Sequence, residues 1–297
     1  MKTRSAFIAI VGCPNVGKSS ILNRLMGAKI AIVSPKPQTT RTRIMGVLTE
    51  GDIQLVFTDT PGYHKPHNKL DEKMGKAISE GIHSMDACML VVEPDSKIQP
   101  AEEELIKRFK REDIPAILVI NKIDTVAEKE KLMKVIFDYS QLYNFESIIP
   151  VSALDGNGMD ALKQELKNLS FESEHLFPDD TLTDQPEKVI AAEYIREKLL
   201  RSLDKEIPHG TAVAIESFKE RDDGSNIIDI EATIFCERDS HKGIIIGKQG
   251  AMLKKISTRA RIDMERFFDC KINLQCWVKV KEDWRNREAL IHNFGLD

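Results

Sequence analysis

The chain has 297 residues, about the length of two domains, and carries a formal net charge of −4. Hydrophobic residues make up 41% and charged residues 30%, which excludes a disordered chain because each domain has enough apolar side chains for a core. The longest apolar runs, such as Ala116–Ile120, are far shorter than the ~20 residues of a membrane-spanning helix, and we expect no signal peptide. Five cysteines at irregular spacing predict a reducing cytoplasm rather than disulfides or a zinc site.

Apolar runs alternate with helical patterns over the first 170 residues. Such alternation is typical of α/β domains in which helices cover both faces of a mostly parallel sheet. The predicted strands are Phe7–Val11, Arg43–Leu48, Ile53–Thr58, Ala87–Glu93, Ala116–Asn121 and Ile148–Ser152. The predicted helices lie near Gly17–Met26, Asn68–Ser84, Ala101–Arg111, Ala127–Tyr143 and Gly158–Leu169. Only the residues Thr49–Asp52 join the second and third strands, so we expect these two to form a hairpin.

An acidic stretch without periodicity covers residues 171–186 and predicts a linker between domains at 1–170 and 187–297. The second domain is predicted to be α+β, with helices separated by strands and a glycine-rich turn. Its predicted elements are a helix over Glu187–Leu203, strands over Thr211–Glu220 and Ile227–Cys236, the turn, a helix over Ala251–Phe268, a strand over Lys271–Val280 and a short last helix. Between Arg238 and Glu288 there are 13 Lys and Arg against 7 Asp and Glu, which predicts a polyanion partner, with a solvated helix face as the alternative.

The first predicted strand leads into a phosphate-binding pattern. The residues Gly12, Cys13, Pro14, Asn15, Val16, Gly17, Lys18 and Ser19 match G-x-x-x-x-G-K-[ST] between a strand and a helix, and Ser20 follows them. Main-chain amides of such a loop wrap phosphate oxygens, and the helix N-terminus adds partial positive charge. Lys18 is predicted to reach the β- and γ-phosphates, and Ser19 to place its hydroxyl on Mg²⁺.

A base-reading pattern, Asn121-Lys122-Ile123-Asp124, follows a later strand. A carboxylate accepts hydrogen bonds from guanine N1 and N2, whereas adenine leaves it unpaired; a site of this kind rejects the wrong partner by about 10⁴-fold. Together with the phosphate loop, the pattern predicts guanine rather than adenine. After the next strand, an amide of Ser152-Ala153-Leu154 is predicted to meet the guanine O6.

Two further segments have the pattern of nucleotide-sensing loops. Asp59-Thr60-Pro61-Gly62 ends the third strand; we expect Asp59 on the magnesium side and the Gly62 amide beside a γ-phosphate. A threonine hydroxyl from the loop before the second strand is predicted to complete the Mg²⁺ shell; Thr40 is favoured and Thr39 is the alternative. The predicted catalytic residues are therefore Lys18, Thr40 and Gly62, and the predicted metal ligands are Ser19, Thr40 and Asp59.

The basic segment contains a second glycine pattern, Gly247-Lys248-Gln249-Gly250, preceded by Gly243, Ile244, Ile245 and Ile246. It matches the G-x-x-G loop with which KH modules clamp a single strand of nucleic acid. Two glycines let main chain approach phosphate, and Lys248 supplies charge. Ile244 and Ile246 are predicted to form an apolar side for bases. A simple helix-entry turn is the alternative.

Taken together, these motifs resemble the bacterial Era family, in which an α/β P-loop GTPase domain precedes an α+β KH domain of type II. The resemblance implies a GTP-hydrolysing switch that binds GTP and GDP, the 3′ end of 16S rRNA and the 30S subunit. It also implies a cytoplasmic protein, expected to be a monomer, with some peripheral attachment to the inner membrane face. In related GTPases a residue at the position of Asn15 helps to bind K⁺.

One residue departs from the pattern of many such GTPases. Tyr63 follows Gly62, where a water-orienting Gln is common. This departure predicts slow intrinsic turnover or a water oriented by other means. The alternative function for the whole chain is a constitutive RNA-binding scaffold with a vestigial nucleotide site.

Overall fold

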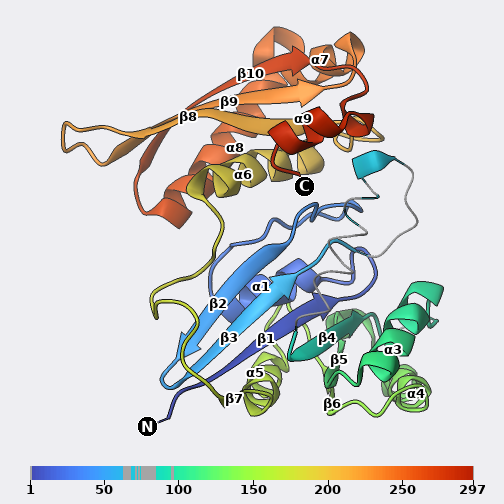
Figure 1. Ribbon diagram of the computed structural model, residues 1–297. Coiled ribbons are helices and arrows are strands. Elements are labelled where there is room, and N and C mark those ends of the chain that lie inside the picture. The colour runs from blue at the N-terminus through green and yellow to red at the C-terminus, as the bar shows by residue number, and fades with distance from the viewer. Residues whose placement is uncertain are drawn as a thin grey trace. The chain divides into compact units, whose positions relative to one another are not determined.

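The computed structural model describes residues 2–62, 68–70, 72, 74, 85–94 and 97–296. The chain divides into two compact units, which are described one at a time (Figure 1). The first comprises Met1–Ala31, Thr40–Lys65 and Met74–Asp184, and the second comprises Ile32–Thr39, Pro66–Lys73 and Gln185–Asp297. The loop before the second strand is therefore shared: Thr39 belongs to the second unit and Thr40 to the first.

The first unit is built on a sheet whose main strand order is β2-β3-β1-β4-β5-β6. Neighbouring strands are parallel except for the β2–β3 hairpin, which confirms the predicted α/β architecture. The strands are β1 (Arg4–Val11), β2 (Ile44–Glu50), β3 (Ile53–Asp59), β4 (Ala87–Val92), β5 (Ala116–Ile120) and β6 (Ser147–Pro150). Strands β4 and β5 are buried along their whole length, as expected when helices cover both faces of a sheet.

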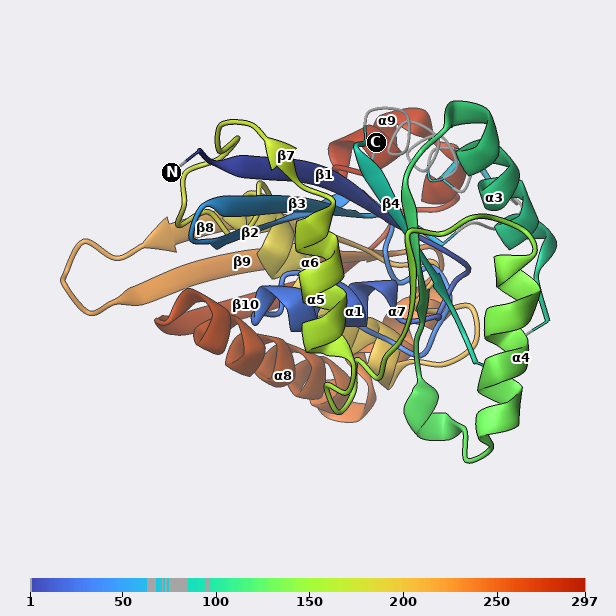
Figure 2. The same cartoon turned by 90° about the horizontal axis from the view of Figure 1, so that it is seen from below.

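Helices cover the two faces of this sheet in pairs. The helices α3 (Pro100–Glu112) and α4 (Lys129–Ser140) pack together on one face, where Phe109 and Tyr139 lie in a core with alternate residues of β1, β4 and β5 (Figure 2). The helices α1 (Lys18–Met26) and α5 (Met159–Asn168) contact each other and β3. Most of the predicted helix over Asn68–Ser84 lies outside the described residues.

Residues predicted to form an unstructured linker pack against the first sheet up to Asp184. The short strand β7 (Phe171–Glu172) pairs with Arg4 and Ser5 at the start of β1, where β4 does not reach because its pairing begins at Ile8. The fully buried Gln54 side chain accepts hydrogen bonds from the Leu176 and Phe177 amides at 2.7 and 2.9 Å. The start of β1 has main-chain groups that β4 leaves free, and pairing with them orders the acidic stretch. The composition of the stretch did not predict this order.

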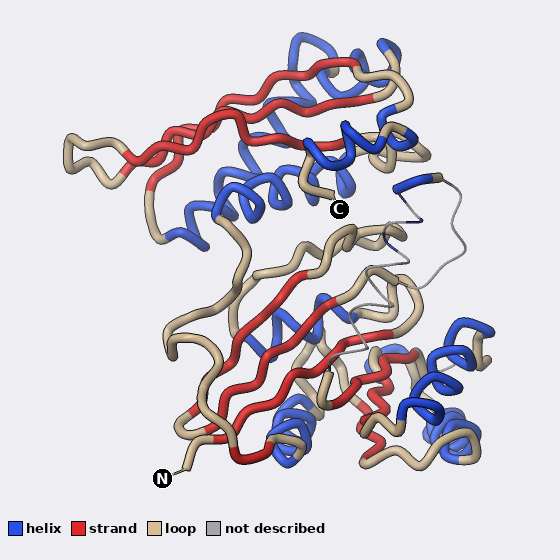
Figure 3. Tube along the Cα trace, in the orientation of Figure 1, coloured by secondary structure: helices blue, strands red, loops and turns tan. Residues whose placement is uncertain are grey.

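The second unit has a three-stranded sheet in the order β10-β9-β8 (Figure 3). Strands β8 (Ala212–Glu220) and β9 (Ile227–Cys236) are antiparallel, whereas β9 and β10 (Lys271–Val280) are parallel. The helices α6 (Glu187–Ser202) and α8 (Ala251–Phe268) pack against each other and share the core of the sheet. The short last helix is α9 (Glu288–Asn293), and no helix among the described residues is long and apolar enough to span a bilayer.

One element of the second unit differs from the prediction. Gly243–Ile246 belongs to the helix α7 (Asp239–Ile246) rather than to a glycine-rich turn, which begins only at Gly247. The helix forms because Ile245 is fully buried in the core and holds this turn of chain in place. Ile244 remains half exposed, as its predicted role requires.

Candidate functional site

The predicted nucleotide-binding motifs meet at one edge of the first sheet. They follow the carboxyl ends of β1, β3, β5 and β6, which lie on the same side because these strands are parallel. Gly12–Gly17 connects β1 to α1, and Lys18, Ser19 and Ser20 form the first turn of that helix. No acidic residue lies in this turn, so the free amides of the helix N-terminus are available to an anion.

Lys18 lies inside the loop that the phosphate motif forms. Its ammonium group is buried and donates to the Gly12 and Cys13 carbonyl oxygens at 3.1 and 3.0 Å. Burial lowers the pKa of Lys18, while the Asp59 carboxylate partly offsets that effect. A buried cation ringed by main-chain dipoles is suited to the oxygens of a polyphosphate.

Three oxygen-bearing side chains converge beside Lys18. Ser19 Oγ donates to Asp59 Oδ2 at 2.6 Å, Thr40 Oγ1 lies 3.3 Å from the same oxygen, and the two hydroxyls are 3.0 Å apart. These are the three predicted metal ligands, which the structure brings together. The alternative residue, Thr39, points elsewhere, because its hydroxyl donates to the Lys36 carbonyl at 2.7 Å.

The donor set fits Mg²⁺. Asp59 is fully buried, and among the described residues its second carboxylate oxygen, Oδ1, has no hydrogen-bond partner. Burial raises the pKa of Asp59, so a cation is needed to stabilise the charged form. Hydroxyl and carboxylate oxygens are the ligands that Mg²⁺ takes beside nucleotide phosphates, with waters completing its shell. When bound, the ion would neutralise charge on the phosphates.

Residues of the N-K-x-D motif contact two other loops, the phosphate loop and the loop after β6. Asn121 is buried; its Nδ2 donates to the Val16 carbonyl at 2.8 Å and its Oδ1 accepts from the Ala153 amide at 3.1 Å. Asn121 therefore ties the phosphate loop to the loop after β6. Asp124 is exposed and accepts a 2.6 Å hydrogen bond from Ser152 Oγ, which aims the carboxylate while leaving its other oxygen available.

The Ser152–Leu154 amides have different partners. The Ser152 amide donates to the Asn157 carbonyl at 2.9 Å, and the Ala153 amide is taken by Asn121. Leu154 has a side chain that is 82% exposed and, within the described part of the chain, no hydrogen bond to its amide. The Leu154 amide is thus the most accessible donor for a base carbonyl, a distinction that the triplet alone did not provide.

Gly62 lies against the phosphate loop. A Cβ at this position would come within 2.7 Å of the Pro14 Cα, so only glycine allows the two loops to approach this closely. In the same segment, the Thr60 hydroxyl donates to the Ile10 carbonyl at 3.0 Å, which fixes the loop to β1. Tyr63 lies outside the described residues.

A buried carboxyl group behind the phosphate loop was not predicted. Glu102 is 1% exposed, accepts from Tyr139 Oη and lies next to Cys13. Burial raises the pKa of the Cys13 thiol to about 12, and the charge of Glu102 adds to that shift. The sequence indicates only a local role for Glu102, that of an acidic residue in the first turn of α3. In this role it accepts a hydrogen bond from the Gln99 amide at 2.7 Å.

The second predicted site lies in the second unit. Gly247 has a φ of 73° and follows α7, while Gly250 precedes α8. A Cβ on Gly247 would lie 2.7 Å from Met252 Cβ, so this turn requires glycine. Lys248 and Gln249 are exposed between the two glycines. The loop presents main chain and one cation to solvent, as a clamp on a nucleic-acid backbone requires.

Family models match both units. Residues 7–122 match a model described as a 50S ribosome-binding GTPase, and residues 206–285 match one described as a KH domain. The chain is 50% identical to the GTPase Era of Ruminiclostridium cellulolyticum over 295 residues, covering 99% of this chain and 98% of that relative. It is also 50% identical to the GTPase Era of Clostridioides difficile over 294 residues, with 99% of each chain covered.

Two solved structures resemble the whole chain, each with a TM-score of 0.94 and 36% identity. One is an Era variant of Aquifex aeolicus bound to GDP·AlF4⁻, matched over 100% of this chain and 99% of that one. The other is an Era in complex with MgGDPNP and nucleotides 1506–1542 of 16S ribosomal RNA, matched over 99% of each chain. The GTPase motifs, the KH domain and the near full-length identity lead to one conclusion: the chain belongs to the Era family of GTPases.

Proposed function

We propose that this GTPase is a nucleotide-controlled switch that binds the 3′ end of 16S rRNA and assists assembly of the 30S subunit. The RNA part of the proposal is supported by the solved relative that holds a 16S rRNA fragment together with a GTP analogue. The observation that carries the switch is the convergence of Ser19, Thr40 and Asp59, where one carboxylate oxygen has no hydrogen-bond partner among the described residues.

Each residue of the nucleotide site has a role in the proposal. The amides of residues 12–17 and the helix N-terminus hold the phosphates, and Lys18 stabilises the charge that develops on them. Ser19, Thr40 and Asp59 hold the Mg²⁺ side, and the Gly62 amide lies where it senses the γ-phosphate. Asp124 reads the guanine edge, with Lys122 and Ile123 beside it, and the loop after β6 meets O6.

The RNA is held by the G-x-x-G loop. Gly247 and Gly250 let the backbone approach phosphates, Lys248 adds charge, and the exposed Ile244 and the neighbouring Ile246 face the bases. Hydrolysis controls this binding only if GTP- and GDP-bound forms differ in RNA affinity, since a ligand shifts an equilibrium by its differential affinity alone.

Other parts of the function follow from the family resemblance. We place the protein in the cytoplasm as a monomer, with peripheral membrane attachment and K⁺ near Asn15 as further predictions. The alternative is a constitutive RNA scaffold with a vestigial nucleotide site. Its sequence would not need to keep Lys18, Asp59, Asn121 and Asp124 in this arrangement.

Filter binding tests the proposal directly. We expect the affinity for a 16S 3′-end RNA to differ at least about fivefold between GDP and a non-hydrolysable GTP analogue, the low end of typical coupling energies. Equal affinity in both nucleotide states and without nucleotide would support the scaffold. Lys248→Gln serves as a variant of the clamp: Lys248 is exposed in the loop, so loss of its charge should weaken RNA binding while GTP hydrolysis continues.

A further inference from the structure

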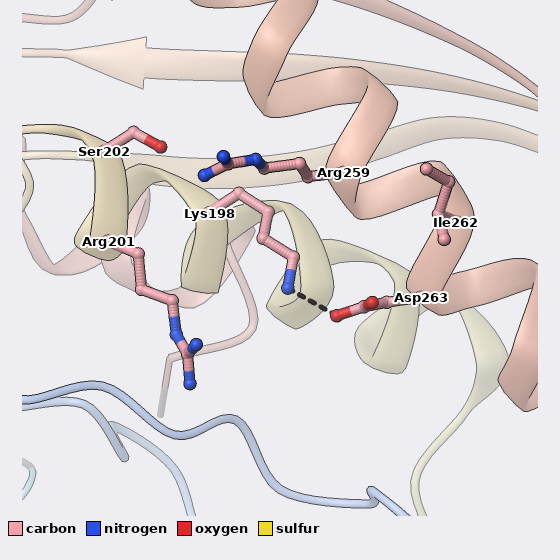
Figure 4. Close-up of a pocket in the computed structure, with 6 residues that line it drawn as sticks. All are labelled: Lys198, Arg201, Ser202, Arg259, Ile262 and Asp263. Carbon is pink, nitrogen blue, oxygen red and sulfur yellow. Dashed lines mark hydrogen bonds and ion pairs between the residues drawn. The ribbon is translucent and has the colours of Figure 1, made fainter.

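A cavity of about 200 Å³ lies between α6 and α8 in the second unit. Its lining comes from one face of each helix at spacings of three and four residues: Lys198, Arg201 and Ser202 on α6, and Arg259, Ile262 and Asp263 on α8 (Figure 4). Three of these six side chains are cationic and one is anionic. None of them belongs to the G-x-x-G loop or to the nucleotide site.

The charges in the cavity are unevenly compensated. The Lys198 ammonium group is paired with both Glu197 and Asp263. Arg201 donates to the Val33 carbonyl at 2.7 and 2.9 Å and lies 3.6 Å from Glu197. Arg259 is exposed, and no ion pair or hydrogen bond holds it among the described residues. The surplus positive charge of the cavity therefore belongs to Arg259.

A hydroxyl group under Arg259 also lacks a partner. Ser202 Oγ is buried and makes no hydrogen bond to any residue that the structure describes. Figure 4 shows Ser202 and the Arg259 guanidinium pointing toward each other from the two helices, while the Lys198 ammonium group points away from them toward Asp263. A buried polar atom without a partner is destabilising, so it calls for a ligand or water. An oxyanion would accept from the hydroxyl and from the guanidinium at once.

The position of the cavity favours RNA as the source of that oxyanion. Lys255, Arg259 and Arg266 are exposed at spacings of four and seven residues, so they form a basic stripe along one face of α8. This stripe begins just after the G-x-x-G loop, at the start of the same helix. From Ala251, where α8 begins, to Arg259 the helix rises by roughly 12 Å, at 1.5 Å per residue, so a strand that continues past the four nucleotides clamped by a KH loop and follows α8 would reach the cavity.

We propose that the cavity between α6 and α8 is a second RNA contact, in which Arg259 and Ser202 hold one backbone phosphate of the strand that leaves the G-x-x-G loop. Arg259 is the residue that admits the phosphate, because its exposed side chain is free to turn outward and uncover the hydroxyl. Arg259 and Ser202 then bind the phosphate oxygens, and Asp263 stays neutralised by Lys198 and by Arg266, 3.8 Å away. The inference rests on the RNA binding proposed above.

The test compares two RNAs and three variants. The long RNA is a fragment equivalent to nucleotides 1506–1542 of 16S rRNA, and the short one has about four nucleotides, the number that the loop clamps, so that none is left to reach the cavity. Arg259→Gln removes the surplus charge, and Ser202→Ala removes the hydroxyl. Lys188→Gln is the matched control, because Lys188 is exposed on α6 outside the cavity and the same charge is lost.

Arg259→Gln should weaken binding of the long RNA about fivefold to tenfold. The plot of log affinity against log salt concentration should become less steep by about 0.7, the value for one single-strand phosphate. Ser202→Ala should weaken it about twofold to threefold, the loss of one hydrogen bond. Binding of the short RNA should change less than twofold, and Lys188→Gln should leave both RNAs unaffected. Equal effects of Arg259→Gln and Lys188→Gln, or an equal loss on both RNAs, would overturn the inference. If the wild-type protein binds neither RNA, the proposed function itself fails.

Discussion

In the proposed function, Lys18 is the residue on which hydrolysis depends most directly. Lys18→Ala should reduce GTP turnover by about 10²–10³-fold, the usual effect of removing one group that stabilises transition-state charge. The loss should appear in single-turnover phosphate release at saturating nucleotide. Lys107→Ala, an exposed change on α3, should hydrolyse GTP at the wild-type rate. Unchanged turnover in Lys18→Ala would remove this residue from the chemistry.

In the proposed function, Asp124 determines which base the site accepts. Asp124→Asn should lower the affinity for GDP by at least about 10²-fold and create affinity for xanthosine diphosphate, because the amide offers a donor where the carboxylate accepted. Competition against a fluorescent guanine nucleotide measures both changes. Ser152 Oγ still has an oxygen to donate to in the variant, so the loop should stay in place. A retained preference for GDP would show that another group reads the base.

Cys13 provides a pH test of the environment of the phosphate loop. Its pKa is raised to about 12, so the thiol is protonated at neutral pH and loses its proton only as the pH rises toward 12. At pH 8 the thiolate fraction is about 10⁻⁴, roughly 10³-fold less than for an ordinary cysteine of pKa 8.5. Iodoacetamide labelling followed by peptide mass spectrometry should show a Cys13 rate that still rises tenfold per pH unit at pH 10. A plateau near pH 9 would contradict the burial described above.

The convergence of the candidate nucleotide-site residues was largely predictable because each has a chemical type at a fixed distance from a strand end. The sequence could not distinguish Thr39 from Thr40, since neighbouring residues on an irregular loop point in directions that only the fold decides. It also did not reveal Glu102, whose place behind Cys13 depends on the packing of α3 against α4.

At the scale of elements, α6 is held in the second unit by a buried carboxylate. Glu197 is fully buried, accepts from the Val33 amide at 3.1 Å and pairs with Lys198. Glu197→Ala should destabilise this unit by about 3 kcal/mol, because it leaves a buried cation and a buried amide with fewer partners.

Urea denaturation followed by tryptophan fluorescence measures this change. The chain has two tryptophans, Trp277 and Trp284, and both lie in the second unit, so the signal reports on that unit. Glu206→Ala, an exposed change in the same unit, should shift the free energy of unfolding by less than about 0.5 kcal/mol. If the two variants unfold at the same urea concentration, the Glu197 contacts do not stabilise the unit.

Elements with a strong hydrophobic period were predicted well from the sequence. The predicted bounds of β9, α8 and β10 agree with the structure to the residue. The helix α7 and the strand β7 were not predicted, since each depends on distant residues. The α7 helix is held by burial of Ile245 in the core, and β7 pairs with the part of β1 that β4 leaves free.

At the scale of the whole molecule, the order of the motifs was enough to predict an α/β domain followed by an α+β domain. Parallel strands bring residues that are far apart in the sequence to one edge, which is why separate motifs form one site. The sequence did not indicate that residues 32–39 belong with the second compact unit, because compactness depends on long-range contacts. One peptide bond joins Thr39 in that unit to Thr40, one of the three predicted metal ligands.

The central claim is that the first unit binds a guanine nucleotide through these residues with Mg²⁺. Isothermal titration calorimetry of the purified protein with GDP, a non-hydrolysable GTP analogue and ATP tests it most directly. We expect one site per chain for each guanine nucleotide, tighter binding of the analogue when Mg²⁺ is present, and no heat from ATP. Absence of heat from both guanine nucleotides, or equal binding of ATP, would contradict it.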